Sequence, residues 1–115
     1  MSMHAAGSRE QREESRVSVD LPVFISMGTQ LTIQGQLKDV SVKSAFIRLR
    51  NSVFLQTNEE IHFTISCSAK DDTDVMSAVG CISRIVAGEG IALYFTKISA
   101  DASKRLTVLI RKAVK

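Results

Sequence analysis

The residues best suited to chemistry are two arginines that stand just before the first apolar stretch of the chain. Arg12 and Arg16 belong to the charged segment 9–16. A guanidinium is planar, always charged and carries its N–H donors in a fixed fork, so two of them close together suit phosphate oxygens and the O6/N7 edge of a guanine. The same residue types also fit a solvated charge run, so the interpretation depends on whether the chain supplies the other half of a site.

A second polar group interrupts the apolar pattern further along the chain. Asp39, Ser41 and Ser44 lie in the segment 39–44, between two apolar runs. Aspartate and serine favour loops because their side chains hydrogen-bond to neighbouring backbone groups. The sequence therefore has a pair of arginines before the first predicted strand and an Asp/Ser loop after the second. This combination is the pattern in the sequence that most favours a binding site.

The elements that must position these residues are short strands. Apolar and polar residues alternate strictly from residue 17 to 27, which is typical of a half-buried strand. Similar patterns predict further strands over residues 31–37, 45–49, 61–67, 75–86 and 91–95. Pro22 cannot donate to a strand ladder and predicts an edge or a bulge in the first strand, while Gly80 predicts a bulge or a close backbone approach in the fifth.

The final segment changes to the spacing of a helix over residues 101–114, after the capping candidates Ser99 and Asp101. Its apolar stripe consists of Leu106, Leu109, Ile110, Ala113 and Val114. Short strands at regular spacing followed by one helix favour an all-β core, namely a small, mostly antiparallel barrel with the helix packed on it or covering one end.

Length and composition limit the class of protein. The 115 residues are enough for one domain with a real core, and the 44% hydrophobic and 23% charged residues are ordinary for a globular protein. A net charge of +3 is low for a general nucleic-acid binder, so no DNA or RNA partner is expected. No apolar run is long enough to cross a bilayer and the polar start lacks the apolar centre of a secretory signal, so we expect a cytoplasmic protein without membrane insertion.

The sequence offers no arrangement typical of an enzyme or a metal site. Cys67 and Cys81 stand singly within apolar runs, which predicts small buried hydrophobes. Ser41 has no histidine near it in sequence, and the carboxylates of residues 70–74 are typical of a solubilising hairpin tip. Barrels that bind single-stranded nucleic acid stack bases on aromatic rings, whereas this chain has no Trp and one Tyr.

With these motifs the chain resembles the PilZ domain family, whose pattern is RxxxR followed by (D/N)xSxxG. Arg12 and Arg16 match the first motif, and Asp39 and Ser41 match the second. The segments 44–49, 79–85 and 90–95 also resemble strands of that family, in the same order. The resemblance extends from residue 9 to the terminal helix, which is nearly the whole chain.

The resemblance implies a six-stranded antiparallel, split-barrel-like β-barrel with one C-terminal helix, which binds the bacterial second messenger cyclic di-GMP without being an enzyme. Arg12 and Arg16 would bind phosphate oxygens and guanine edges or stack on the bases, with Arg9 as a candidate accessory residue. Asp39 would accept hydrogen bonds from guanine N1 and N2 groups or orient an arginine, and Ser41 would donate to a phosphate or a base acceptor. No cofactor or metal is expected beside this ligand.

One motif position departs from the family, because Ser44 stands where glycine is usual. Glycine would serve a backbone angle or a close approach there, and serine adopts the left-handed conformation at a cost of about 1 kcal/mol. This predicts weakened rather than abolished binding, with Ser44 still part of the site.

The expected organisation is a flexible N-terminal tail over residues 1–8 and one PilZ domain over residues 9–115. Within it we expect a motif arm (9–16), the barrel (17–98) and the helix (101–114). The arm would order around the ligand and change the surface offered to a downstream protein.

A second function fits the same sequence, namely an adaptor of this fold that has lost nucleotide binding and acts only through protein contacts. Its candidate partner surface is the cationic side of the terminal helix, formed by Lys104, Arg105, Arg111, Lys112 and Lys115. A helix that is simply packed on the barrel, with solvated charges outside, is the favoured explanation of these residues.

Overall fold

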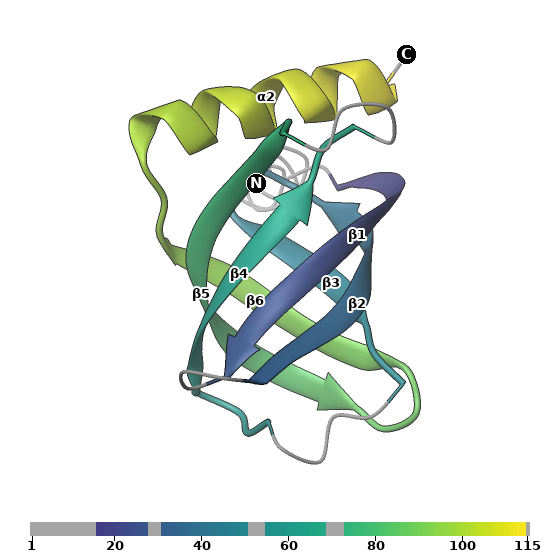
Figure 1. The fold of residues 1–115 in the computed structure, drawn as a ribbon. Coiled ribbons are helices and arrows are strands. Elements are labelled where there is room, and N and C mark those ends of the chain that lie inside the picture. Colours follow the sequence, from purple (N-terminus) through teal and green to yellow (C-terminus); the bar gives the residue numbers. More distant parts are fainter. Residues whose placement is uncertain (1–15, 28–30, 51–54, 69–72, 115) are drawn as a thin grey trace, which may run out of the picture.

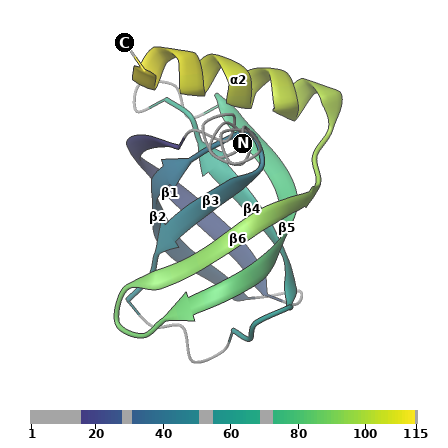
Figure 2. The same ribbon diagram turned by 180° about the vertical axis from the view of Figure 1, so that it is seen from behind.

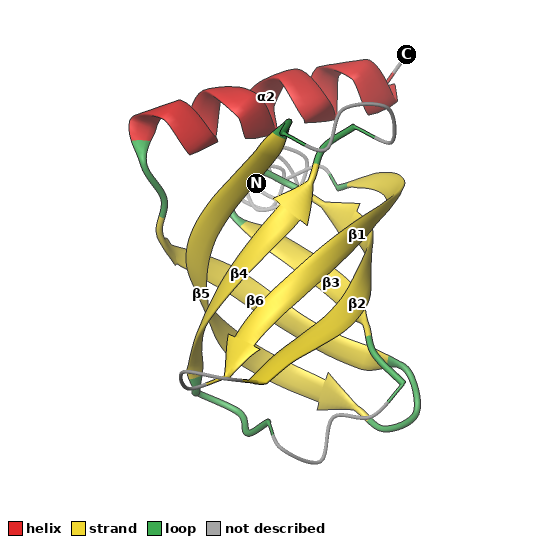
Figure 3. Ribbon diagram, viewed as in Figure 1, coloured by secondary structure: helices red, strands yellow, loops and turns green. Residues whose placement is uncertain are grey.

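The structure is a computed structural model that describes residues 16–27, 31–50, 55–68 and 73–114. Strands make up most of this part of the chain, followed by a helix (Figure 3). The elements are β1 (Val17–Met27), β2 (Leu31–Val40), β3 (Ser44–Arg48), β4 (Glu60–Ser66), β5 (Val75–Val86), β6 (Gly90–Lys97) and α2 (Ala100–Val114). Each strand predicted from alternation is present, with small differences at the ends.

The strands close into a barrel in the order β1-β2-β3-β6-β5-β4, and all neighbouring pairs are antiparallel. Figure 1 views the barrel with β1 and β4 in front, and Figure 2 shows β3 and β6 from the opposite side. The predicted six-stranded antiparallel barrel is therefore confirmed. Closure gives each of the described strands a paired neighbour on both sides.

Pro22 does not lie at a sheet edge, because β1 is paired on both sides. It follows a register irregularity between Ser18 and Leu21 and precedes Val23, the first β1 residue that pairs with β4. Its missing N–H thus falls where the pairing of β1 is incomplete. Of the two predicted placements, the edge is wrong and the neighbourhood of a bulge is confirmed.

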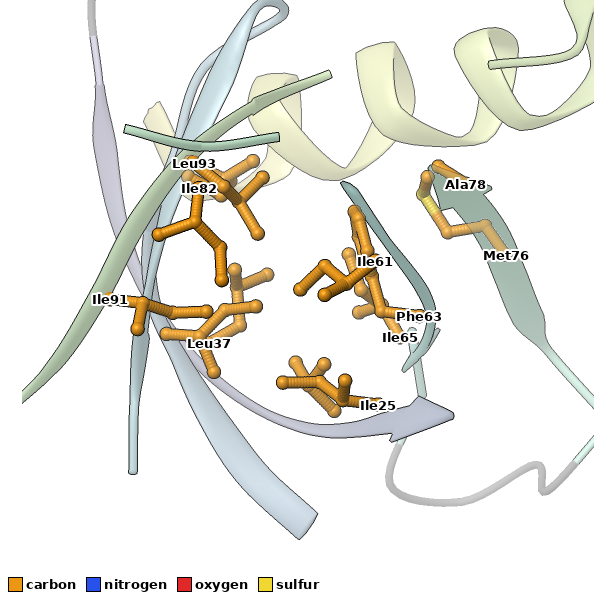
Figure 4. Packing of buried hydrophobic residues seen from close by; sticks show 14 of the residues in the cluster. Ile25, Leu37, Ile61, Phe63, Ile65, Met76, Ala78, Ile82, Ile91 and Leu93 are labelled. Atoms are coloured by element: carbon orange, nitrogen blue, oxygen red, sulfur yellow. The ribbon is translucent and has the colours of Figure 1, made fainter. Parts of the chain in front are cut away.

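The core fills the inside of the barrel with one parity of each strand. The most completely buried large side chains include Ile25, Leu37, Phe63, Ile82 and Leu93, all at most 2% exposed. In Figure 4 these side chains point from the surrounding strands toward a common interior. Strict alternation in the sequence therefore identifies the inward face of each strand correctly.

Gly80 is a position where any side chain would be crowded by its neighbours. A Cβ atom added there would lie 2.9 Å from a methyl of Leu93 and 3.2 Å from the ring of Phe63. The register between β5 and β6 also shifts between Val79 and Gly80. Both predictions for Gly80, a bulge and a close approach, are confirmed.

Helix α2 crosses one end of the barrel and contacts β1 and β5 (Figure 1). Ser99 caps its N-terminus, since the Ser99 Oγ accepts a hydrogen bond from the Ala102 N–H at 3.0 Å. Ala102 and Leu106 are buried, at 4% and 1% exposure, and close that end of the core. Ala113 lies on the same stripe as Leu109 and Ile110 but is exposed, so the barrel covers only the earlier part of the stripe.

An ion pair joins α2 to the segment before β5. Arg105 Nη1 donates to Asp74 Oδ1 at 2.7 Å, and Arg105 Nε donates to Asp101 Oδ2 at 3.3 Å. Asp74 therefore anchors the helix, whereas the sequence predicted only a solubilising turn residue. The side chains of Arg105 and Asp74 are 41% and 38% exposed, so the pair orients the helix more than it stabilises it.

The two cysteines are free thiols with different surroundings. Cys67 packs against the core and is half-buried, and burial together with the nearby Asp74 raises the pKa of its thiol. Cys81 is also half-buried, but it pairs with Tyr94 on the outer face of the barrel. The prediction of small buried hydrophobes is thus only half right for Cys67 and wrong for Cys81.

Candidate functional site

The arginine immediately before β1 reaches two of the three polar positions of the second motif. Arg16 Nη1 donates to Asp39 Oδ1 at 3.1 Å, and Arg16 Nη2 donates to Ser44 Oγ at 3.0 Å. The register explains this convergence, since Ser18 near the start of β1 pairs with Asp39 near the end of β2. The two prongs of one guanidinium therefore bridge β2 and β3.

The turn between β2 and β3 is organised around the hydroxyl of Ser41. Ser41 Oγ accepts hydrogen bonds from the backbone N–H groups of Lys43 and Ser44, both at 3.1 Å, and the Ser41 N–H donates to the Ser44 carbonyl at 2.8 Å. Ser41 is 1% exposed and is a buried polar residue of the described chain. Its hydroxyl thus faces into the turn, where it fixes the backbone between Asp39 and Ser44.

Ser44 needs no unusual backbone angle. Among the described residues other than glycine, the residue with positive φ is Asn58, and Ser44 begins strand β3 with an extended backbone. The expected cost of a left-handed serine is therefore wrong. The hydroxyl of Ser44 lies 3.2 Å from Ser41 Oγ and receives the second prong of Arg16, so the side chain has joined the polar cluster.

The three-residue cluster of Arg16, Asp39 and Ser44 lies at the surface. The side chains of Arg16 and Asp39 are 44% and 33% exposed, so solvent screens their attraction and the pair contributes little to stability. Its effect is geometric, because it holds a planar cation and a carboxylate in fixed relative positions with part of each open to a ligand. Donors and acceptors that are already oriented lose less entropy on binding.

Two of the predicted site residues, Arg12 and Arg9, lie outside the described residues. The other predicted site residues are described, and they lie together although their two motifs are well separated in sequence. They are Arg16, Asp39, Ser41 and Ser44.

Tyr94 is a residue near the cluster that the sequence motifs did not reveal. It pairs with Ser44 across the β3–β6 ladder and is 46% exposed. A hydrogen bond with the neighbouring Cys81 thiol raises the pKa of its phenol. Alternation in β6 predicts that Tyr94 faces outward, but only the register of two distant strands places it beside Ser44.

A second group of polar contacts in the described chain joins β1 to β2. Asp20 Oδ1 accepts hydrogen bonds from Gln36 Nε2 at 2.9 Å and Lys38 Nζ at 3.3 Å, and these contacts lower the pKa of its carboxyl. The described residues contain no cluster of three or more His, Cys, Asp or Glu side chains that could hold a metal ion. In the same part of the chain, no helix has the length and apolarity that a membrane span requires.

Solved structures with similar folds support the barrel architecture. The inhibitor of motility MotI/DgrA of Bacillus subtilis aligns with a TM-score of 0.71 and 18% identity over 86% of this chain, which spans 49% of that protein's chain. The PilZ domain of YcgR from Escherichia coli, solved with cyclic di-GMP, gives a TM-score of 0.68 and 13% identity over 87% of this chain and 88% of that one. The PilZ domain of CeSA from a cellulose-synthesizing bacterium gives 0.61 and 17%, over 87% and 95%.

At these identities the structural likeness establishes the fold, and the family assignment comes from sequence. Comparison with curated proteins finds no match. The family model described as PilZ domain, in contrast, matches residues 10–112. That range includes both motifs, the six strands and most of α2. On this match, and with the closed barrel and motif cluster described above, the chain belongs to the PilZ domain family.

Proposed function

We propose that this chain is a non-enzymatic receptor for cyclic di-GMP that signals to a downstream protein. The observation that carries the proposal is the convergence of Arg16, Asp39 and Ser44, which come from before β1, from β2 and from β3. Sequence motifs predicted these residues as parts of one site, and the Arg16 side chain is hydrogen-bonded to both of the others.

The chemistry of the cluster suits a nucleotide with phosphodiesters and guanines. Arg16 offers fixed donors to a phosphate oxygen or to the O6/N7 edge of guanine. Asp39 offers an acceptor to the guanine N1 and N2 groups, which an anion-binding cluster of arginines alone would not provide. Ser41 contributes by fixing the turn, since its hydroxyl is 1% exposed and already accepts two backbone hydrogen bonds.

Signalling would follow from the position of Arg16 at the start of the described chain, directly before β1. A ligand that binds Arg16 together with Arg12 would draw the motif arm of residues 9–16 toward β2 and β3. The surface of the barrel next to α2 would change as a result. A downstream protein that recognises this surface would then distinguish the two states.

Isothermal titration calorimetry with cyclic di-GMP tests the proposal. We expect saturable binding by the full chain and at least about tenfold weaker binding by Arg16→Ala and Asp39→Ala, because a hydrogen bond to a charged group contributes about 1.5–3 kcal/mol and 1.4 kcal/mol is a factor of ten. Arg50→Ala is the matched control, since it removes the same charge beyond the far end of β3 from Ser44. Absence of binding by the intact chain at high micromolar ligand would reject the receptor function.

The alternative is an adaptor of the same fold that acts without nucleotide. One observation favours it, namely that the Ser44 hydroxyl, where the family has glycine, occupies a donor of Arg16 that a ligand would otherwise use. The cationic helix surface is its candidate contact, although Arg105 is engaged by Asp74 and Asp101, and Lys115 lies outside the described residues. Equal recovery of a partner with and without cyclic di-GMP would support the adaptor.

A further inference from the structure

The outer face of the barrel carries an aromatic residue directly beside the polar cluster. Ser44 and Tyr94 are register partners on β3 and β6, and residues that are directly opposite in an antiparallel pair share a face, with Cβ atoms about 5 Å apart. Tyr94 is 46% exposed, so much of its ring faces solvent. The Tyr94 side chain therefore starts about 5 Å from that of Ser44, whose hydroxyl accepts a hydrogen bond from Arg16.

The phenol of Tyr94 also has a partner within the chain. The same ladder position continues to Cys81 on β5, and the Tyr94 phenol contacts the Cys81 thiol. The Tyr94 phenol thus has a hydrogen-bond partner within the chain, on the strand that flanks β6 opposite to β3. Such a partner restrains the side chain before a ligand binds, which lowers the loss of rotamer entropy on binding.

The adjacent row of the same face is apolar between β3 and β6. Asp39 pairs with Phe46, and Phe46 pairs with Ala92. Ala92 is 7% exposed but does not belong to the core cluster, because Ile91 and Leu93 on either side of it point inward. The register therefore places Asp39, Phe46 and Ala92 in one row across β2, β3 and β6. This row lies next to Tyr94 on the outer face of the barrel.

An exposed aromatic ring beside a carboxylate and a guanidinium that are hydrogen-bonded to each other matches the chemistry of a purine, which has a π-face and a polar edge. Base stacking on an aromatic ring tolerates exposure and is common at sites for single-stranded nucleic acids. An exposed tyrosine alone would require no explanation. Its position opposite Ser44, together with the patch of Phe46 and Ala92, distinguishes it from other exposed aromatic residues such as Phe24.

We propose that Tyr94 is the stacking residue for a guanine of the bound nucleotide, with Phe46 and Ala92 as the apolar floor beside it. This inference rests on the proposed function, because it assumes that the cluster of Arg16, Asp39 and Ser44 binds cyclic di-GMP. It adds a contact from β6, so that the site extends across β2, β3 and β6.

The composition of the chain provides a direct readout. Tyr94 is the one tyrosine in the sequence and there is no tryptophan, so intrinsic tyrosine emission reports on this residue alone. We expect cyclic di-GMP to quench this emission with the same midpoint as the calorimetric titration. A parallel titration of N-acetyltyrosinamide corrects for light absorbed by the guanines.

Three variants test the role of the ring by calorimetry. Tyr94→Leu keeps apolar bulk and should bind about tenfold or more weakly, whereas Tyr94→Phe keeps the ring and should bind within about twofold of the original chain. Phe24→Leu is the matched control, because Phe24 is 39% exposed on the outer side of β1 and pairs with Gln34 and Thr64, away from the cluster. Far-UV circular dichroism confirms that each variant is folded.

The outcomes separate this inference from the receptor function. If the chain binds the nucleotide but its tyrosine emission is unchanged and Tyr94→Leu binds equally well, the stacking role is refuted and the receptor function stands. If Tyr94→Phe loses as much affinity as Tyr94→Leu, the hydroxyl and not the ring makes the contact, and the stacking role is again refuted. If the intact chain gives no calorimetric signal, both proposals fail.

Discussion

Replacing Ser41 with alanine should destabilise the fold through the turn that carries the site. Ser41 Oγ accepts the N–H groups of Lys43 and Ser44 at 3.1 Å, and the residue is 1% exposed. Alanine fits the space but removes the acceptor for both donors. Leaving a buried partner unsatisfied costs about 1–3 kcal/mol. Because Lys43 is exposed and water can replace part of the loss, we expect a decrease of about 1–2 kcal/mol in the free energy of unfolding.

Urea unfolding followed by far-UV circular dichroism measures this change, and thermal unfolding gives an independent value. For a chain of this length, a loss of 1 kcal/mol in the free energy of unfolding lowers Tm by about 4 °C. We therefore expect Ser41→Ala to lower Tm by about 4–8 °C. Ser44→Ala is the control, because it removes a hydroxyl from the same turn but keeps the backbone hydrogen bonds to Ser41. Its effect should stay within about 0.5 kcal/mol.

The result that would refute this reasoning is a Ser41→Ala variant with the original urea midpoint and an unchanged slope. The hydroxyl would then be replaced by water at no cost, and the turn would be held by the Ser41 N–H and the strand ladders alone. A change of slope without a change of midpoint would point to the denatured state and would equally contradict the structural explanation.

Four further predictions follow from the same structure. Arg16→Lys keeps the charge but cannot reach Asp39 and Ser44 with one planar group, so calorimetry should show at least about tenfold weaker cyclic di-GMP binding; equal affinity would mean that charge alone suffices. Ser44→Gly frees Arg16 Nη2 and should tighten binding, and an unchanged affinity would show that the hydroxyl does not compete. Phe63→Ala opens a cavity at a residue that is 2% exposed and should cost about 3–5 kcal/mol in urea unfolding, against a small effect for the exposed Phe24→Ala. The pKa of the Asp20 carboxyl, measured by NMR, should lie below 3.8 and should rise toward that value in Gln36→Leu. Because folding lowers this pKa, the contribution of Asp20 to stability is present above pH 4 and is lost as the pH falls through the folded pKa. Asp20→Asn should therefore reduce the loss of stability at acid pH.

Local periodicity predicted the strands because the inside of a closed barrel is uniformly apolar. Ile25, Leu37, Phe63 and Ile82 each belong to a simple alternation, and each is buried. Cys81 was predicted as buried from its residue type, although it shares the outward parity of Ser77 and Val79, opposite to the buried Ala78 and Ile82. The parity of β5 changes only between Ile82 and Arg84, where its register with β6 shifts and Ile85 comes to pack against the core. Sequence alternation alone does not specify where such a bulge lies.

The sequence predicted the residues of the candidate site that belong to the two motifs, and no others. Asp39 and Ser41 were found by type and spacing, but the buried position of the Ser41 hydroxyl depends on how the turn folds back on itself. Tyr94 was not found, since its place beside Ser44 depends on the pairing of β3 with β6, which are far apart in sequence. Such long-range registers arise from the closure of the whole barrel and have no local signal.

The hydrogen bonds that Arg16 makes within the chain bear on whether this protein responds to a nucleotide. An exposed ion pair such as Arg16 with Asp39 contributes about 0–1 kcal/mol, whereas a hydrogen bond between a charged group and its ligand contributes about 1.5–3 kcal/mol. A phosphodiester or a guanine edge can therefore displace the internal partners at small cost. In the proposed receptor this cluster would be one half of the site, and the difference between a receptor and a ligand-independent adaptor would depend on what the second arginine, Arg12, adds to Arg16. We accordingly expect Arg12→Ala to abolish the nucleotide response in calorimetry while leaving the urea stability unchanged.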